Sequence, residues 1–392
     1  MIPVEEAINI IDKSITPLEK KERKNVLKAN GYILFDDVYS PINMPPFRQS
    51  AMDGYALLLT NDVTYTVIDE VRAGDNHSPV LKAGEAVRIF TGAPLPHSAN
   101  AVIMQEKVTV TNKKITFEKP ASFGKNIRPL GEQVKKGGIA LTKGTKLTPA
   151  AIGYLTSLGI TEIFVFKKPS IAIVVTGNEL VEAGEPLDYG KIYESNSGML
   201  LSALNSLGQA EITIHKVRDD YAHTFSILEK ATAQYDMVII TGGISVGDYD
   251  FVGKALQELT VEQIFYKIKQ KPGKPLFFGK KKNTHVFALP GNPAAALSCF
   301  YIYIYPALQK ISGDLSFSLP RITARSASDF IKKGDKAQFL KAILKDGEAT
   351  ILEGQSSAML QTFALANAMV YVPEEQNEIS IGDPVEVICL PV

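Results

Sequence analysis

The sequence predicts a multidomain protein in which an α/β domain with a largely parallel sheet is flanked by β-rich modules. Its 392 residues are too many for one ordinary core, so we expect two to four domains. Strand-like and helix-like segments alternate over residues 168–312, which is typical of a parallel sheet covered on both faces. Short strand-like segments before about residue 140 and after residue 317 predict the β-rich modules.

The N-terminal part begins with a predicted helix. Residues 4–32 are expected to be helical, because the apolar residues that open this stretch share one helical face, at Val4, Ala7, Ile8 and Ile11. The segment PINMPPF (41–47) then excludes helix, because each of its prolines lacks a backbone N–H. Short strands follow to about residue 140, and residues 148–166 return to one helix and one strand.

Three strand-like segments of the α/β region end in loops that combine glycine with polar residues. These loops are TGNEL (176–180), TGGISVGDYD (241–250) and LPGNP (289–293). Ligands of open α/β sheets bind at the carboxyl ends of strands. The three loops together therefore predict one binding site at this edge of the sheet.

The loop after the strand DMVII (236–240) has the chemistry of an anion site. Gly242 and Gly243 allow a ligand to approach the main chain, whose N–H groups can cradle a phosphate, and Ser245 adds a hydroxyl. Asp248 and Asp250 would repel that phosphate unless a cation lay between them, which suggests Mg²⁺. The alternative is a plain turn in which Asp250 is a helix N-cap.

A lysine-rich segment, KIKQKPGKPLFFGKKK (267–282), is a second candidate for anion binding. Its prolines keep the middle of the segment out of a helix, and lysine acts as a point charge for phosphate-like groups. The sheet order could bring it beside the glycine loop. The alternative is a solvated surface charge run. The lysines are Lys267, Lys269, Lys271, Lys274, Lys280, Lys281 and Lys282.

Three further polar residues follow or open strand-like segments. Asp53 in SAMDGYA could be a turn acid, Thr91 in RIFTGAP could close a turn, and Glu179 in TGNEL could cap the next segment. Each is equally a candidate for a functional site. The five histidines show no spacing typical of metal ligands, so we expect structural roles for them.

Composition excludes several classes of function. Lys+Arg and Asp+Glu both total 42, so no overall basic field exists to hold nucleic acid or an anionic membrane. The two cysteines form no CxxC pair, which suits a reducing cytoplasm, and no segment resembles a signal peptide or a membrane span. The GxSxG and GxxxxGK[ST] motifs are missing, so serine-hydrolase and P-loop functions lose support.

Taken together, the motifs resemble the molybdopterin molybdenumtransferase family, which completes molybdenum cofactor biosynthesis and includes the C-terminal domain of gephyrin. They occur in the family's order over nearly the full chain. The matching segments are PPFRQSAMDGYA, RIFTGAPLP, AVIMQE, NIRPLGE, VVTGNEL, TGGISVGDYD, KPGKP and LPGNPAAAL.

The resemblance implies an elongated homodimer whose chains have four domains. Residues 1–42 and 140–167 would form a discontinuous linker domain, into which a β-domain at 43–139 is inserted. Residues 168–316 would form the molybdopterin-binding, three-layer α/β domain, and residues 317–392 a C-terminal β-barrel.

The resemblance also implies the reaction and its partners. Adenylylated molybdopterin and molybdate would bind, Mg²⁺ would assist, AMP would leave and molybdenum would join the dithiolene. A molybdopterin adenylyltransferase would supply the substrate, and recipient molybdoenzymes would take the product. Tungstate is an alternative metal oxyanion, since it is nearly isosteric with molybdate.

Most of the family's important positions fall on residues of the segments described above, and Asp219, Lys341 and Ser357 lie outside them. Glu179, Asp219 and Asp250 would hold Mg²⁺ or position water, with Asp248 as a further metal ligand. Asp53 and Thr91 would close the cleft, against the α/β domain of the other subunit. The implied anion and substrate ligands are Gly242, Gly243, Ser245, Lys267, Lys271, Lys274, Pro290, Pro293, Lys341 and Ser357.

Two positions depart from the family pattern. Gln133 stands where an acid is frequent, and Lys341 stands where an arginine is usual, which keeps the charge but loses the bidentate fork. Two rival functions are a molybdopterin adenylyltransferase-like enzyme and a non-catalytic cofactor carrier or scaffold. The β-modules argue against the first, and the acids at 53, 179, 219 and 250 argue against the second.

Overall fold

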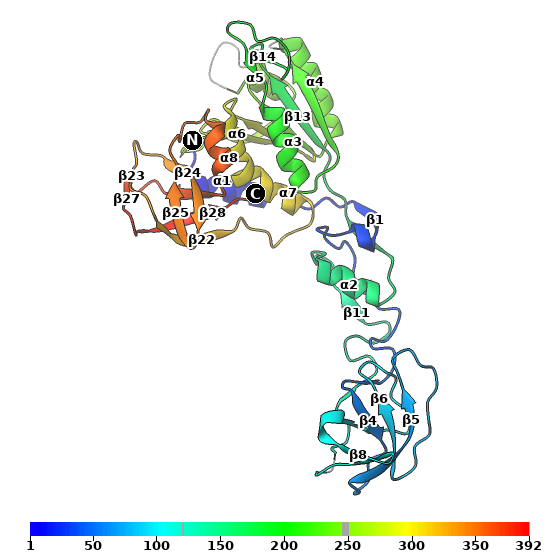
Figure 1. Ribbon diagram of the computed structural model, residues 1–392. Helices are drawn as coiled ribbons and strands as arrows, with labels where there is room; N and C mark the ends of the chain where they lie inside the picture. The colour runs from blue at the N-terminus through cyan, green and yellow to red at the C-terminus, as the bar shows by residue number, and fades with distance from the viewer. Residues whose placement is uncertain (120, 219, 245–250, 392) are drawn as a thin grey trace. The chain divides into compact units, whose positions relative to one another are not determined.

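A computed structural model describes residues 1–119, 121–218, 220–244 and 251–391. The chain forms two compact units (Figure 1). Met1–Glu22 and Phe166–Val392 make the first, and Arg23–Val165 the second. Within the described residues, no helix combines the length and apolar character needed to cross a membrane. The predicted four-domain boundaries stay a prediction.

A six-stranded sheet in the order β16-β13-β17-β21-β20-β18 is the centre of the first unit. Its first four strands are parallel, as the alternating sequence predicts. The edge strands β20 and β18 were not predicted, and β20 runs antiparallel to both of its neighbours. The strands are β13 (Ile171–Thr176), β16 (Ile212–Val217), β17 (Met237–Thr241), β18 (Glu262–Tyr266), β20 (Phe277–Lys281) and β21 (Thr284–Leu289).

Helices cover both faces of this sheet because its central strands are apolar on both sides. Ile171 and Ile173 of β13 pack in a core with α3, α6, α7 and the N-terminal helix α1. Ala172 and Val174 of the same strand pack in a second core with α4 and α5. This confirms the predicted three-layer arrangement. The helices are α3 (Asn196–Ser206), α4 (Tyr221–Gln234), α5 (Phe251–Glu258), α6 (Pro293–Cys299) and α7 (Tyr305–Ile311).

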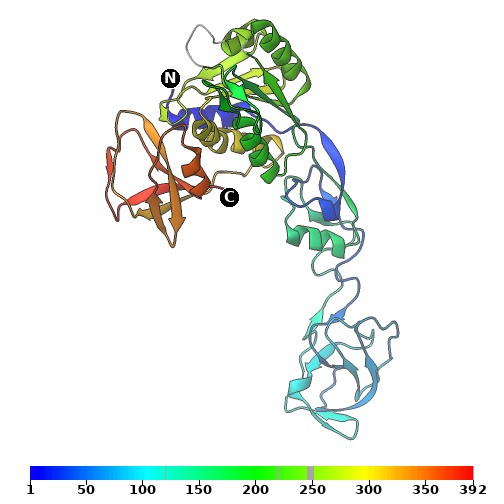
Figure 2. The ribbon, with the colours of Figure 1, turned by 45° about the horizontal axis from the view of Figure 1, so that its top comes forward.

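The predicted helix over residues 4–32 was wrong beyond its first turns. Helix α1 spans Val4–Ser14, and Lys21–Asn25 forms strand β1. Pro17 has no N–H to continue the helical ladder and disfavours helical angles at Thr16. In Figure 2 α1 is the blue helix beside the α/β elements, where Val4, Ala7 and Ile11 are buried in their core.

The C-terminal region closes into a five-stranded barrel, as predicted. The ring runs β24-β25-β22-β28-β26, and β26 pairs again with β24. Leu340, Val370 and Val387 fill its core. A short strand β19 (Gln270–Lys271) from the α/β region pairs in parallel with β24. The other elements are β22 (Arg321–Ser326), β23 (Phe330–Ile331), β24 (Ala337–Lys345), β25 (Glu348–Ile351), α8 (Leu360–Leu365), β26 (Ala368–Val372), β27 (Glu378–Ile379) and β28 (Pro384–Cys389).

The second unit contains the predicted β-rich module and a small helix-and-strand core. The module's sheet has the order β7-β4-β6-β5-β9-β8. Val26, Leu34, Leu155 and Val165 belong to the small core. The main elements are β4 (Gly54–Leu57), β5 (Thr64–Val71), β6 (Glu85–Ile89), β7 (Ala101–Met104), β8 (Thr109–Thr111), β9 (Lys114–Thr116), α2 (Pro149–Ser157) and β12 (Glu162–Phe166). Shorter strands are β2 (Val38–Tyr39), β3 (Gln49–Ser50), β10 (Ile127–Arg128) and β11 (Ile139–Leu141).

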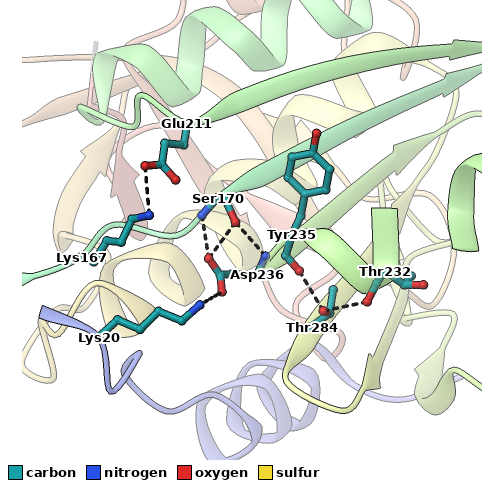
Figure 3. A network of polar contacts seen from close by, with 8 residues as sticks. All are labelled: Lys20, Lys167, Ser170, Glu211, Thr232, Tyr235, Asp236 and Thr284. Carbon is teal, nitrogen blue, oxygen red and sulfur yellow. Dashed lines mark hydrogen bonds and ion pairs between the residues drawn. The ribbon is translucent and has the colours of Figure 1, made fainter. Parts of the chain in front are cut away.

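Asp236 anchors the amino end of the parallel sheet (Figure 3). Its carboxylate accepts hydrogen bonds from the Ser170 backbone N–H at 2.9 Å and hydroxyl at 2.8 Å, and from the Lys20 ammonium at 3.0 Å. Burial alone would raise the pKa of Asp236, but the bonds from Ser170 and Lys20 outweigh it and lower this pKa below 3.8. The ionised carboxylate therefore ties the starts of β13 and β17 to residue 20.

We expect Asp236→Asn to lower the melting temperature of the first unit by about 2–6 °C near pH 7. Because the folded-state pKa lies below the unfolded value of 3.8, this contribution is complete above about pH 4 and is lost as the pH falls through the folded pKa. Calorimetry of both proteins between pH 7 and 3 should show the difference shrinking. Glu211→Gln, which breaks the exposed pair with Lys167, is the control and should shift melting by about 1 °C or less. A pH-independent difference would contradict this account.

Candidate functional site

A cleft of about 770 Å³ lies at the carboxyl ends of β13, β17 and β21. All three predicted loops reach it, because parallel neighbouring strands end at the same edge of the sheet. Its wall also includes Pro275 from the lysine-rich segment and Ala358 from the loop before α8. The structure thus brings together segments that lie more than a hundred residues apart in the sequence.

The glycine loop after β17 packs directly on the end of β13. Gly242 has a φ of +90°, and a Cβ there would lie 2.4 Å from the Thr176 carbonyl oxygen. Gly243 has a φ of +62°, and its Cβ would lie 2.8 Å from the Thr176 hydroxyl. Only glycine fits both the backbone angles and the space. The predicted ligands Asp219, Ser245, Asp248 and Asp250 lie outside the described residues.

Asn196 joins the ends of β17 and β21 and was missed by the sequence reasoning. Its side-chain Nδ2 donates to the Thr241 hydroxyl at 2.7 Å and to the Gly291 carbonyl at 2.8 Å. Asn196 Oδ1 and Thr176 Oγ1 are buried at the cleft with no hydrogen-bond partner in the described part of the chain. In the sequence Asn196 looks like any polar residue at the start of a helix, so only the fold could reveal this role.

The two glutamates of the cleft differ in what they contact. Glu179 is exposed, and its carboxylate lies over Gly177, where a Cβ would meet its oxygen at 2.8 Å. Glu194 is engaged with the start of α3, since it accepts hydrogen bonds from the Ser197 N–H at 2.9 Å and from the Ser197 hydroxyl. Glu179 is therefore the carboxylate that a ligand can reach.

The lysine-rich segment divides between the two ends of the sheet. Lys271 and Lys274 are exposed, and neither side chain has an ion-pair or hydrogen-bond partner among the residues described. Lys267 directly follows β18, whose carboxyl end lies at the same edge as the cleft, and its ammonium lies 4.7 Å from the Tyr266 ring centroid. Lys280 and Lys281 pair with the start of β21, at the opposite edge. Lys280 and Lys281 therefore lie away from the cleft, and anion binding by Lys267, Lys271 and Lys274 stays a prediction.

Lys341 has a different environment from the predicted one. It is 2% exposed, and its ammonium donates to the carbonyls of Gly354, Ser356 and Met359 at 2.8, 3.2 and 3.1 Å. All three hydrogens are used, so we revise its predicted role from binding an anion to holding a loop. Burial lowers the pKa of Lys341. The loop that it holds carries Ser357 to the LPGNP segment.

Ser357, Pro290 and Pro293 meet at the start of α6. The Ser357 hydroxyl accepts from Asn292 Nδ2 at 2.9 Å, and its carbonyl accepts from the Ala295 N–H at 3.1 Å. Pro293 is the first residue of α6, where a missing N–H costs nothing. The Pro290 carbonyl lies 3.5 Å from the Thr241 hydroxyl. These three predicted residues therefore belong to the cleft and its rim.

Asp53 and Thr91 meet in the second unit. The Asp53 carboxylate accepts hydrogen bonds from the Thr91 backbone N–H and hydroxyl, both at 2.7 Å. The backbone bond first, and then the hydroxyl bond, lower the pKa of Asp53. The structure thus brings the two residues into one local cluster, and their part in closing a cleft stays a prediction.

The side chains of the described ranges do not form a complete metal site. No group of three His, Cys, Asp or Glu side chains there is arranged to hold an ion by itself. Glu179 is the one predicted metal ligand that falls inside these ranges.

Comparison with known proteins assigns the family. The chain matches the MoeA N-terminal region (domain I and II) over residues 2–159, a probable molybdopterin binding domain over 172–310 and the MoeA C-terminal region (domain IV) over 323–390. It is 36% identical over 376 residues to the molybdopterin molybdenumtransferase of Haemophilus influenzae, covering 93% of both chains. The chain belongs to the molybdopterin molybdenumtransferase family. This confirms the resemblance drawn from the motifs.

Other members of the molybdopterin molybdenumtransferase family agree over the full length. The protein of that name from Staphylococcus aureus strain Mu50 is 32% identical, covering 99% of this chain and 95% of its own. A crystal structure of the molybdopterin biosynthesis moeA protein from Pyrococcus horikoshii OT3 is 30% identical, with a TM-score of 0.85 over 99% of this chain and 100% of that one. The family likeness therefore includes the β-modules as well as the α/β domain.

Gly242→Ala should destabilise the first unit much more than Gly190→Ala does. Both glycines have positive φ, at +90° and +84°, but a Cβ at Gly190 would have nothing within 4 Å. The control therefore measures backbone strain alone, about 1 kcal/mol, and Gly242→Ala adds the clash with Thr176, about 1–3 kcal/mol more. Thermal melting of the two variants checks this. Equal losses would show that the glycine loop is not packed against β13.

Proposed function

We propose that this chain is an enzyme that inserts molybdenum into molybdopterin, which is the activity for which its relatives are named. The observation that carries the proposal is the cleft at the carboxyl ends of β13, β17 and β21. It combines a closely packed glycine loop with the nearby segment that carries the exposed Lys271 and Lys274. Backbone N–H groups and lysine ammonium groups both suit the oxyanions molybdate and phosphate.

The finer proposal is that adenylylated molybdopterin and molybdate are the substrates and that AMP leaves. Cleavage of a phosphoanhydride bond develops negative charge, which must be neutralised where it forms. Lys271 and Lys274 supply positive charge for this, and Lys267 adds more at the same edge. Asp53 and Thr91 are proposed to act in the same reaction, since their cluster leaves the carboxylate ionised and exposed.

The residues present fit the Mg²⁺ that the family implies. Glu179 offers an exposed carboxylate at the cleft, and Mg²⁺ commonly binds one or two carboxylates together with substrate phosphates. Asp219, Asp248 and Asp250 are proposed as the other acids on sequence grounds. When bound, Mg²⁺ would supply charge neutralisation at the phosphates. The chain's own groups bind and orient the two substrates.

We also propose that the enzyme is a cytoplasmic homodimer, which receives its substrate from an adenylyltransferase and passes its product to molybdoenzymes. The free thiols of Cys299 and Cys389 suit a reducing compartment. Light scattering of the purified chain measures the oligomeric state.

The test is AMP release from adenylylated molybdopterin by the full-length chain with Mg²⁺, with and without molybdate. We expect molybdate-dependent release that Asp250→Ala abolishes. Lys271→Ala should raise the molybdate concentration for half-maximal release about tenfold, the usual effect of losing one charged contact. Lys281→Ala, which removes a lysine of the same segment at the far edge of the sheet, is the matched control and should leave that concentration unchanged.

Three results would count against this function. Substrate binding without AMP release would favour a carrier or scaffold. Formation of adenylylated molybdopterin from ATP and molybdopterin would favour an adenylyltransferase. Equal effects of the Lys271 and Lys281 substitutions would show that Lys271 does not bind the anion. Running the assay with tungstate decides which oxyanion is preferred.

A further inference from the structure

A buried polar network lies directly beneath the loop that carries Lys271 and Lys274. Gln270 is 0% exposed and Tyr303 is 1% exposed. The Tyr303 hydroxyl donates to Gln270 Oε1. Gln270 Nε2 in turn donates to the Pro272 carbonyl at 2.9 Å and approaches the Gly273 carbonyl at 3.5 Å. The backbone between the two lysines is thus hydrogen-bonded to a side chain that is itself held from behind.

The loop also packs on this network without spare space. Gly273 has a φ of +89°, and a Cβ there would lie 2.4 Å from Cys299 Sγ and 2.8 Å from Gln270 Nε2. Burial raises the pKa of Cys299 to about 12, so its thiol stays protonated. The thiol donates to the Gly273 carbonyl oxygen, which lies 3.7 Å from Cys299 Sγ. The amide and the thiol therefore form the floor on which the loop rests.

Tyr303 comes from an unusual stretch of helix. Phe300–Ile304 (η3) is a π-helix between α6 and α7, and such segments are rare and frequent at functional sites. Helix α6 starts at Pro293 in the cleft and ends at Cys299 beneath the lysine loop. One continuous helical rod therefore carries the LPGNP loop at its start and supports the lysine loop further on.

The same loop is held from the barrel side. Gln270 and Lys271 pair in parallel with Ala337 and Gln338 of β24. Lys269 donates to Glu374 at 2.6 Å. The backbone of residues 269–273 is thus held on both sides, while Lys271 and Lys274 extend from it into solvent.

We propose that Gln270 and Tyr303 are positioning residues, which fix the loop so that Lys271 and Lys274 are placed for an oxyanion before it arrives. The inference rests on the proposed function, because it takes these lysines as anion ligands. Two like charges on a loose loop would move apart, and an arriving anion would have to order them. A loop that is already ordered avoids that cost, so the network should act on affinity.

The first experiment measures molybdate binding to the full-length chain by calorimetry. Tyr303→Phe removes only the hydroxyl that holds Gln270 and should weaken molybdate binding about tenfold. Tyr301→Phe is the matched control: it removes a hydroxyl from the same π-helix, with no hydrogen-bond partner among the described residues, and should change binding less than about twofold. Gln270→Met, which leaves the Pro272 carbonyl without its donor, should weaken binding more than Tyr303→Phe.

The second experiment separates positioning from general structural damage. In the AMP-release assay, Tyr303→Phe should raise the KM for molybdate about tenfold and leave kcat within about twofold, because the loop binds and does not react. A loss of folded protein would instead lower the apparent kcat and leave the KM for molybdate unchanged, because fewer active molecules would remain. Thermal melting of all three variants confirms that each is folded at the assay temperature.

The outcomes distinguish this inference from the proposed function. Unchanged molybdate binding in both Tyr303→Phe and Gln270→Met, or an equal change in Tyr301→Phe, would overturn the inference even if the wild type releases AMP. If the wild type releases no AMP but the variants bind molybdate more weakly than it does, the inference is supported and the proposed reaction is contradicted. A wild type that does not bind molybdate would overturn both.

Discussion

Burial of β13, β17 and β21 on both faces is the constraint on which the rest of the first unit depends. Each strand presents apolar residues to two helical layers, so a shift of any of the three by one residue would exchange the side chains of the two cores and disrupt their close packing. Parallel neighbours held in register must end together. The cleft is therefore a direct consequence of core packing, since the same registry that buries Ile173 and Ile239 brings Thr176 against Gly242.

The strand ends approach each other closely. This leaves no room for side chains in the glycine loop, and the ends are held together by side-chain hydrogen bonds. Gly242 and Gly243 have no room for a side chain, and Asn196 holds Thr241 and Gly291 through one amide nitrogen. Buried polar groups of this kind are costly unless they are satisfied. Among the described residues, Asn196 Oδ1 and Thr176 Oγ1 are the exceptions at this cleft, because neither has a hydrogen-bond partner there.

The barrel contributes to the cleft by holding loops in place. Lys341 uses its whole ammonium on three carbonyls of the segment that carries Ser357, and β24 pairs with the strand that leads into the lysine loop. Burying an ammonium group costs desolvation free energy, and its hydrogen bonds to three carbonyls offset this cost because every donor is used. The C-terminal region is thus part of the architecture of the site.

The sequence by itself determined the elements whose signal is local. Short, β-branched apolar runs located β13 and β17, helical periodicity located α3 and α4, and glycine beside polar residues marked the three loops of the cleft. Local pattern also misled, because the apolar face of residues 4–11 was extended past Pro17. Only the tertiary structure decided which charges are exposed. Lys341, Lys271 and Lys281 are the same side chain in three environments, one buried on carbonyls, one exposed in the loop that leads to Pro275 of the cleft, and one at the far edge of the sheet. Their roles depend on neighbours that are distant in the sequence, and residue type and spacing carry no information about those neighbours.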